Sequence, residues 1–581
     1  MSGKVNKSNK KIILTVLLIM IFISIYMYSC EYNDLGLFTS LDGEDEINNG
    51  KNVANELDIG SKEFFLELKE KQKNKNPLND INVRKAIFYT IDRKRIVNEL
   101  LGEYGEVLNS LFTKDSYYYN SSWSEYNYDL NKAKEFLSKA GYGVDNPLYI
   151  TIGSDSGISS QTIKKMIKED LDKIGIEIWI LNESSKEWYQ DCVMKGNYEL
   201  GVWSIKNFDG SSLNFNFSLD KMPPYKTDEN KNCYNFYWYN NPDIDEILMR
   251  TAKESDTGKK KELFKEFQDI LARDAVVLPL YSRLFSIAYN NKKIENIDIS
   301  IKNNKVFFNI ENWILLDKEQ TGEDKINEIV VGYEGENYIL PNPLDLNYIS
   351  NLVLKGLWEI NEKGDYEPVL VEEDYVSSND IIASIPSLET NVTLKDKIFW
   401  EDGSPITSED VKYTYDAILE NDSIVDNNED YSKIEGIEII NEKEFNIVFK
   451  ENFKDWKKLF GIVFQRGSLE GKDINSILIG EIIASGPFKI GECVDGEYLL
   501  LEKNEFYSGK VSGIDNIKIL FDTDINNLIS MLKDGEIDLL NIKYFDLDLM
   551  RNLEDNEDLN LWVEPGNMLE HLAICLKPVE G

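Results

Sequence analysis

Hydrophobic positions recur with the periods of helices and strands over most of residues 64–281. Apolar side chains at intervals of three and four residues predict helices, and apolar side chains at every second residue predict strands. We predict helices over residues 82–100, 131–140, 163–174 and 259–272, and strands over residues 64–68, 148–152, 176–180 and 276–281. The strand, helix and strand pattern over residues 148–180 has the length of a right-handed βαβ crossover in a mainly parallel or mixed sheet.

The pattern starts again after a polar, low-complexity join at residues 317–325. A strand is predicted over residues 326–332, and residues 392–400 alternate before a turn at Asp402-Gly403. Thr407 and Asp410 have the spacing of a capping box, and a helix with apolar side chains at 411, 415 and 418 follows. Because 581 residues exceed what one core usually supports, the pattern predicts two α/β lobes.

The first thirty residues differ from the rest of the chain. Four lysines precede an uncharged apolar run over residues 12–28, which ends at Ser29-Cys30 and is followed by acidic residues. This is the pattern of an export signal. The small residue before Cys30 resembles the lipobox of bacterial lipoproteins, in which the cysteine becomes the lipidated N-terminus. The alternative is an uncleaved membrane anchor, for which 17 residues are near the lower limit.

Composition excludes several classes of function. The net charge of −39 repels nucleic acid and favours a water-facing body, so we expect no nucleic-acid partner. The single histidine, His571, rules out a histidine-rich metal site, and we expect it at a strand edge rather than in a catalytic triad. Cys192, Cys233, Cys493 and Cys575 lack metal-ligand spacing and read as small buried residues, with a Cys192–Cys233 disulfide as the alternative. We therefore expect no cofactor, no metal and no enzymatic activity.

Several short motifs lie at consistent spacing along the chain. They are FWEDGSPITSEDV at 399–411, SGPFKI at 485–490 with LEKNEFY at 501–507, GEID at 535–538, NVRKAI at 82–87 with IDR at 91–93, YDLNKA at 128–133 with GY at 141–142, and VLPLY at 277–281. Together they resemble the oligopeptide- and dipeptide-type solute-binding proteins of ABC importers, the bacterial extracellular solute-binding protein family 5. The similarity extends over nearly all of residues 64–581.

The resemblance implies an α/β fold with two lobes, similar to the type II periplasmic binding proteins of the large peptide-binding class. In that family the segment with the Asp-Gly turn comes first, whereas here it comes second, so the chain looks circularly permuted. The implied organisation is a lipoprotein signal peptide (1–30), a tether and first strand (31–75), a distal lobe (76–295), a hinge crossing and join (296–325), and a proximal lobe (326–581).

Residues 64–68 and 572–576 both resemble the same strand of the family, so that element is present twice. If the permuted chain folds as a whole, only one copy can occupy the strand's place in the sheet. The alternative is that the chain is a gene fragment, or the remnant of two adjacent genes.

The resemblance also implies where a ligand binds. One wall lies near Trp203, where the family has an aspartate a few residues further on that pairs with the α-amino group of the ligand. Lys206 stands at that position here, and its charge would repel an ammonium and attract a carboxylate. Asp209 could take over amine recognition, or Lys206 could point into solvent. Tyr333 and Tyr338, after the first strand of the second half, could line the opposite wall or be surface aromatics.

The aromatic run at residues 234–239 is more typical of core than of a ligand wall, and residues 241–245 are expected to cap a helix. The leading hypothesis is a monomeric, lipid-anchored binding protein at the outer face of the cytoplasmic membrane. It would capture peptides and deliver them to an ABC permease and its ATPase. The alternatives are the same architecture with a metal chelate or glycan as ligand, a non-transporting surface or sensor protein, and a decayed fragment.

Overall fold

The structure is a computed structural model. It describes residues 59–72, 76–206, 213, 216–219, 222, 235–254, 256–297, 306–307, 310–316, 326–335, 349–360, 366–372, 389–420, 428–450, 454–472, 479–494, 496–510 and 513–578. Internal contacts divide the chain into two compact units. The large unit comprises the described residues within 47–338, 491–503 and 510–581, and the small unit comprises those within 339–490 and 504–509. Each unit is described by itself.

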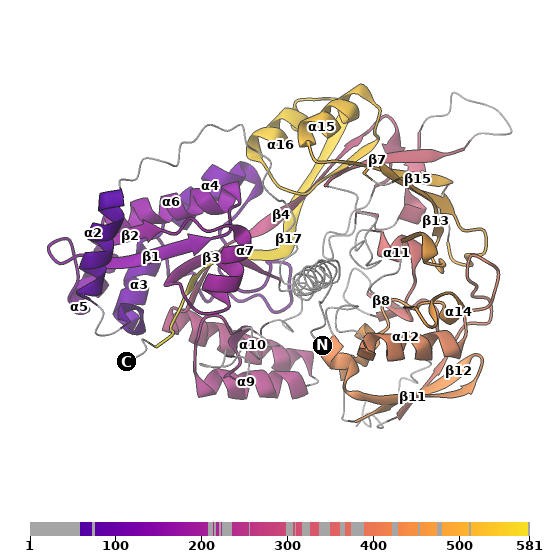
Figure 1. Cartoon of the computed structure of the whole chain (residues 1–581), viewed down its shortest axis with the longest axis horizontal. Helices are drawn as coiled ribbons and strands as arrows, with labels where there is room; N and C mark the ends of the chain where they lie inside the picture. Colours follow the sequence, from indigo (N-terminus) through magenta and orange to yellow (C-terminus); the bar gives the residue numbers. More distant parts are fainter. Residues whose placement is uncertain are drawn as a thin grey trace, which may run out of the picture. The chain divides into compact units, whose positions relative to one another are not determined.

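A ten-stranded mixed sheet organises the large unit (Figure 1). Its strand order is β13 (Phe488–Val494), β14 (Tyr498–Lys503), β15 (Asn516–Asp522), β7 (Glu328–Glu334), β16 (Leu539–Ile542), β4 (Val277–Asn290), β17 (Leu559–Ile574), β3 (Leu200–Lys206), β1 (Leu148–Ser154) and β2 (Ile176–Ile180). Strands β15, β7 and β16 run parallel to one another, as do β3, β1 and β2. The long strands β4 and β17 pair antiparallel between these two groups. The large sheet thus contains strands from both predicted lobes.

The predicted βαβ unit is confirmed. β1 and β2 pair in parallel, and α6 (Ile158–Asp172) connects them. The buried side chains of α6 include Ile163, Ile167 and Leu171, the apolar residues whose helical spacing predicted the helix. Gly175 has a φ of 88°, a left-handed conformation that ends the helical segment before β2 begins.

The helix predicted over residues 82–100 is wrong in one respect, because two helices occupy this stretch. α3 spans Ile81–Thr90 and α4 spans Arg93–Leu101. The side chain of Asp80 accepts a hydrogen bond from the backbone of Asn82, and that of Asp92 accepts one from the backbone of Arg95. Asp92 is an N-cap with non-helical backbone, so the chain starts a new helix where the apolar spacing alone suggested continuity.

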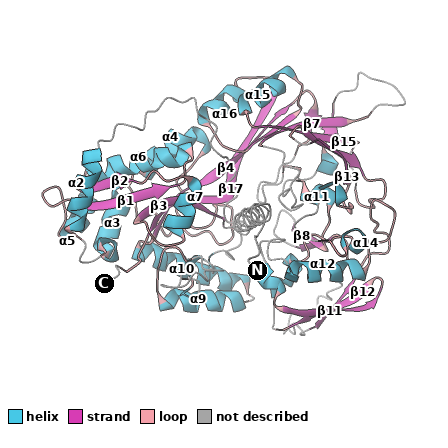
Figure 2. Ribbon diagram, in the orientation of Figure 1, coloured by secondary structure: helices cyan, strands magenta, loops and turns pink. Residues whose placement is uncertain are grey.

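The other helices of the first half follow their predicted positions. They are α5 (Leu130–Lys139), α9 (Pro242–Lys253) and α10 (Thr257–Asp274), and each begins after an Asp or Asn that caps it. The predicted cap before α9 is confirmed, since the side chain of Asn241 accepts from the Asp243 backbone. Helices α9 and α10 lie side by side (Figure 2). The aromatic side chains described within residues 236–239 are buried, as expected for core.

The strand predicted over residues 64–68 is wrong, because these residues belong to helix α2 (Ile59–Glu70). Phe65 is buried and its ring contacts those of Tyr149 and Trp179, whereas Phe64 and Leu66 are exposed. Glu67 and Lys71 form an ion pair one helical turn apart. Of the apolar side chains in this segment, only Phe65 is buried. A helix can bury one such side chain and leave its neighbours in solvent, whereas a strand inside the sheet would bury the neighbours as well.

The second copy of that element, residues 572–576, contributes to β17 in the centre of the sheet. β17 pairs with β3 from Met568 to Ile574 and with β4 over most of its length. Beyond the strand, the side-chain amide of Asn76 donates to the carbonyl oxygens of Cys575 and Lys577, at 3.4 and 3.1 Å. The segment that leads into α3 therefore lies against the segment that follows β17, although the two are about 500 residues apart in sequence.

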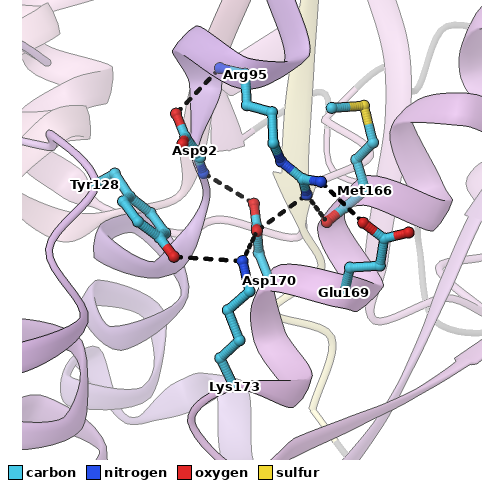
Figure 3. A network of polar contacts seen from close by, with 7 residues as sticks. All are labelled: Asp92, Arg95, Tyr128, Met166, Glu169, Asp170 and Lys173. Carbon is cyan, nitrogen blue, oxygen red and sulfur yellow. Dashed lines mark hydrogen bonds and ion pairs between the residues drawn. The ribbon is translucent and has the colours of Figure 1, made fainter. Parts of the chain in front are cut away.

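A polar network holds α4 against α6 (Figure 3). The carboxylate of Asp170 is fully buried, and it accepts from the backbone of Asp92, from the Arg95 guanidinium and from the Lys173 ammonium. Lys173 also bonds the hydroxyl of Tyr128. A buried carboxylate is stable only when paired in this way, so Asp170 ties three separate segments together.

At the other end of the sheet, α15 (Ile525–Asp534) and α16 (Leu547–Glu554) pack on the strands (Figure 1). Their buried side chains, Leu528, Leu532, Met550 and Leu553, form one apolar core cluster with Leu540 of β16. Asp524 caps α15, and Gly535 ends it in a left-handed conformation with a φ of 76°.

The small unit contains a three-stranded antiparallel sheet of β10 (Glu389–Thr393), β12 (Glu444–Phe449) and β11 (Ile434–Asn441). The predicted turn and helix are confirmed. Gly403 has a φ of 80°, and α12 (Ser408–Glu420) follows with Val411, Tyr415 and Ile418 buried. The Asp410 carboxylate accepts from the backbone N–H and the hydroxyl of Thr407 at 2.9 and 3.0 Å.

The remaining elements are short. They are α7 (Ser185–Glu187), a π-helical turn (Trp188–Val193), β5 (Ile294–Glu295), β6 (Ile314–Leu315), α11 (Ser350–Val353), β8 (Trp358–Ile360), β9 (Tyr366–Pro368), α13 (Asn428–Tyr431), α14 (Arg466–Leu469), and 3₁₀ turns at Pro77–Asn79, Gly102–Tyr104, Ile310–Asn312, Lys454–Lys458 and Ile479–Glu481. Among the helices of the described ranges, none has the length and apolar character needed to cross a membrane.

Candidate functional site

The large sheet contains two groups of parallel strands, and the carboxyl ends of both groups lie beside the same stretch of β4 and β17. β16 ends at Ile542, which pairs with Ser286 of β4, and β7 ends level with it. β3 runs in the opposite sense and ends at Lys206, which pairs with Met568 of β17. Residues 282–285 and 564–567 lie between these ends, and we call them the crossing segment. In mixed α/β sheets, ligands bind outside the carboxyl ends of strands, so this stretch is the candidate site.

A charged cluster lies at the border of the crossing segment with β3, and Arg283 is its member within the segment. Nε of Arg283 donates to Oε2 of Glu570 at 2.9 Å, and the hydroxyl of Ser204 donates to the same oxygen at 2.8 Å. Tyr281 and Ser204 both pair with Glu570 across the sheet, so the four residues come from three neighbouring strands. The Glu570 side chain is 1% exposed, whereas that of Arg283 is 35% exposed. The pair thus combines a buried carboxylate with a guanidinium that reaches the surface.

The pKa of Arg283 is set by two opposing effects. Burial alone would lower it, but the Glu570 carboxylate more than offsets the burial, and Asp155, which follows β1, adds to the negative field. The pKa is consequently raised above that of a free arginine, and the guanidinium carries its charge at every physiological pH.

The other border of the crossing segment carries buried polar atoms without a hydrogen-bond partner in the described structure. They are Oγ of Ser286, Oδ1 of Asn541 and Oε2 of Glu334. Burial raises the pKa of Glu334, with a partly opposing bond from the backbone N–H of Lys543. The three atoms do not form one cluster. Asn541 pairs with Ile287 and Tyr333, the chain neighbours of the other two residues, and so lies on the opposite face of the sheet from them. Buried polar groups are normally satisfied, so each of these atoms marks a place where water or a ligand can complete the bonding.

Tyr333 lies at this border, at the carboxyl end of β7. It pairs with Asn541, and its ring packs edge-on against that of Phe521. The side chain is partly buried, and burial raises its pKa to about 12. Its hydroxyl is therefore protonated at neutral pH and can donate a hydrogen bond. The position is compatible with the predicted role as a ligand wall, which stays a prediction.

Trp203 has a different environment. Its side chain is 4% exposed and packs against the rings of Trp188, Tyr198, Tyr237 and His571. Gly201 makes room for it, since a Cβ at that position would meet the Trp203 ring at 2.3 Å. In this structure Trp203 is a core residue, and contact with a ligand stays a prediction.

The expectation that His571 lies at a strand edge is wrong. It lies on β17 between β3 and β4, and its side chain is completely buried. Nε2 is 2.9 Å from the hydroxyl of Tyr237. Burial lowers the pKa of His571 to about 3, so the ring is neutral. The strand predicted from residue 572 onward is part of β17, but the two strands that cover its edges come from distant parts of the chain.

Of the five predicted ligand residues, the structure describes the side chains of Trp203 and Tyr333 and the backbone of Lys206. The backbone of Lys206 is placed at the end of β3, beside Met568. Asp209, Tyr338 and the predicted lipidation site Cys30 lie outside the described residues. The role of the amine-recognition loop and the lipid anchor therefore remain predictions.

Sequence reasoning missed Arg283 and Glu570. Each is the one charged residue of a stretch that is otherwise uncharged and mostly apolar, residues 278–287 and 568–574. Buried charges in strands are normally paired with an opposite charge. That rule could have suggested each as the partner of the other.

The expected burial is confirmed for two of the four cysteines that were predicted to be buried. Cys192 and Cys575 are buried free thiols, whereas Cys493 is a free thiol that is only partly buried, and Cys233 lies outside the described residues. The alternative Cys192–Cys233 disulfide is wrong, because Cys192 is free. In the part of the chain that the structure describes, no group of His, Cys, Asp or Glu side chains could hold a metal ion.

A family model named bacterial extracellular solute-binding proteins, family 5 Middle, matches residues 33–227 and 367–577, which together exceed half of the chain. Among curated relatives, the glutathione-binding protein GsiB of Escherichia coli O6:K15:H31 is 26% identical over 212 residues, and that of Salmonella choleraesuis is 27% identical over 213 residues. Each match covers 35% of this chain and 40% of the relative. The chain therefore spans about two fifths of the length of these relatives.

Among solved structures, the oligopeptide-binding protein AppA of Bacillus subtilis, in complex with a nonapeptide, is 24% identical, with a TM-score of 0.32 over 36% of this chain and 43% of that one. NikZ of Campylobacter jejuni, in complex with Ni(L-His), is 22% identical, with a TM-score of 0.34 over 40% of this chain and 45% of that one.

Proposed function

Because the chain belongs to family 5 of the bacterial extracellular solute-binding proteins, we propose that it captures oligopeptides outside the cytoplasmic membrane and delivers them to an ABC importer. The family consists of binding proteins rather than enzymes, so the chemistry required of the chain is recognition and release. The large mixed sheet and the helices that pack on it have the α/β fold class predicted from the sequence.

The observation that supports a binding role most directly is the convergence of strand ends on the crossing segment. β7 and β16 from one side, and β3 from the other, point their carboxyl ends at the pair formed by β4 and β17. Exposed backbone at strand ends can pair with the main chain of a peptide without reading its sequence. Tyr333 and the charged pair at the border of the crossing segment would then supply the side-chain contacts.

A peptide ligand is favoured by the curated relatives, which are named for binding glutathione, itself a small peptide. The proposal includes a monomeric protein that works with a permease and an ATPase, and that is held at the membrane by a lipid on Cys30. It also includes the circularly permuted order, which the bonds from Asn76 to residues 575 and 577 support.

A second candidate ligand is a non-peptide anion, such as a metal chelate. Lys206 stands where the family has an amine-binding aspartate, and its charge favours an anionic group over an ammonium. Thermal-shift measurements with peptide pools, glycans and metal chelates separate the two candidates. Copurification with a permease tests the transport role. A protein that is stabilised by none of the peptide pools, and that copurifies with no permease, would refute the proposal.

A further inference from the structure

The guanidinium of Arg283 has unused hydrogen-bonding capacity at the candidate site. Arginine has five N–H donors in a rigid fork, and here Nε is committed to Glu570. Within the described residues, Nη1 and Nη2 make no further hydrogen bond or ion pair, and 35% of the side chain is exposed. One edge of the fork is therefore fixed, and the other is available to a ligand.

The pair with Glu570 also orients the guanidinium. Glu570 is 1% exposed and is itself held by the Ser204 hydroxyl at 2.8 Å. A side chain whose orientation is already fixed loses little conformational entropy when it binds a ligand.

We propose that Arg283 binds a carboxylate of the ligand through Nη1 and Nη2, and that the chain therefore selects solutes with an anionic end. Planar, bidentate recognition of carboxylates is the geometry for which arginine is best suited. This inference rests on the proposed function and names the terminal group that the site recognises. It also agrees with Lys206, which stands in place of an amine-binding aspartate.

The sheet register suggests the length of such a ligand. Ile287 is four residues from Arg283 along β4, and it pairs with Asn541, which in turn pairs with Tyr333. At about 3.3 Å per residue this is about 13 Å along the strand, and the two strand spacings of about 4.8 Å each bring the separation of Arg283 and Tyr333 to about 16 Å. An extended peptide of about four to five residues spans it, with its carboxylate at Arg283 and its other end near Tyr333.

The test uses the full chain and two tetrapeptide pools of the same composition, one with free carboxyl ends and one with amidated ends. Affinity is measured by isothermal titration or native mass spectrometry. We expect the wild-type protein to bind the carboxylate pool roughly 10- to 100-fold more tightly, because a hydrogen-bonded charge contributes about 1.5–3 kcal/mol. Arg283→Gln should bind both pools at the level of the amidated one.

Three further variants keep the test decisive. Arg283→Lys keeps the charge but loses the fork, so it should retain only part of the preference. Arg283→Gln combined with Glu570→Gln removes the unpaired buried carboxylate, so it should fold and still show no preference. Arg273→Gln, an exposed arginine paired with Asp274 at the end of α10, is the matched control and should behave as wild type.

Equal affinity of the wild-type protein for both pools would overturn the role of Arg283 while leaving peptide capture intact. A preference that survives in the Arg283 and Glu570 double variant would overturn it as well. Binding of neither pool would refute peptide capture itself, and with it this assignment.

Discussion

Acidification should weaken the centre of the large sheet through a single residue, His571. The ring is completely buried between β3 and β4, and burial lowers its pKa from 6.5 to about 3. In the unfolded chain the ring takes up a proton below pH 6.5, whereas in the folded protein it stays neutral down to about pH 3. The unfolded state therefore binds more protons between these values, and stability falls as the pH is lowered through this window.

The size of the effect follows from the two pKa values. A pH of 4.5 lies two units below the pKa of the ring in the unfolded chain, whereas the ring in the folded protein is still neutral at this pH. With about 1.4 kcal/mol per unit, His571 should make the free energy of unfolding about 3 kcal/mol smaller at pH 4.5 than well above pH 6.5. Carboxylates also titrate in this range, so the contribution of His571 has to be isolated.

The chain makes that isolation simple, because His571 is its single histidine. We expect the unfolding free energies of wild type and His571→Gln, measured with denaturant, to depend differently on pH between 7.5 and 4.5, with the variant losing about 3 kcal/mol less. The carboxylate contribution cancels in the comparison. The histidine ring signal in an NMR spectrum should also stay at its neutral position down to pH 4.5 in the folded protein. A ring that titrates near pH 6.5, or the same pH dependence for the two proteins, would refute the burial argument.

Three other predictions follow from particular contacts. Gly201→Ala should destabilise the protein by about 1–3 kcal/mol, because the new Cβ would meet a tryptophan ring at 2.3 Å. Gly513→Ala, with open space around it, is the control. Equal thermal unfolding of the two variants would contradict the packing argument. Asp170→Asn should cost about 1.5–3 kcal/mol through its bonds to two cations, while Asp172→Asn, in an exposed pair, should change the unfolding free energy by less than about 0.5 kcal/mol. Cys30→Ala should release the body from the membrane or leave an unprocessed precursor, and unchanged mass with unchanged membrane retention would leave a plain anchor instead.

Elements whose packing is local were predictable from the sequence. The βαβ unit of residues 148–180 and helix α12 each have apolar residues at one clear period, and each is bounded by turn or capping residues. Strand β4 was predicted only to residue 281, although it continues to Asn290. Arg283 interrupts its apolar pattern, and the sequence does not reveal that Glu570 compensates for that charge in the neighbouring strand.

The candidate site was predictable only as a region. Lys206 and Tyr333 were chosen from the family resemblance, and both lie at strand ends that border the crossing segment. The charged pair at the border of that segment joins residues 287 positions apart. Alternation predicts which face of a strand a residue occupies, but it does not predict which strand lies beside it.

The twofold presence of one strand shows how tertiary context decides between two local structures. Residues 64–68 and 572–576 resemble the same family strand, yet the first forms part of α2 and the second part of β17. Residues 569–574 are all buried between β3 and β4, so they gain apolar burial on both faces and hydrogen bonds on both edges. Once β17 occupies this place, residues 64–68 have no free central edge to join. Their Glu and Leu residues favour a helix, and α2 buries Phe65 against Tyr149 and Trp179 instead.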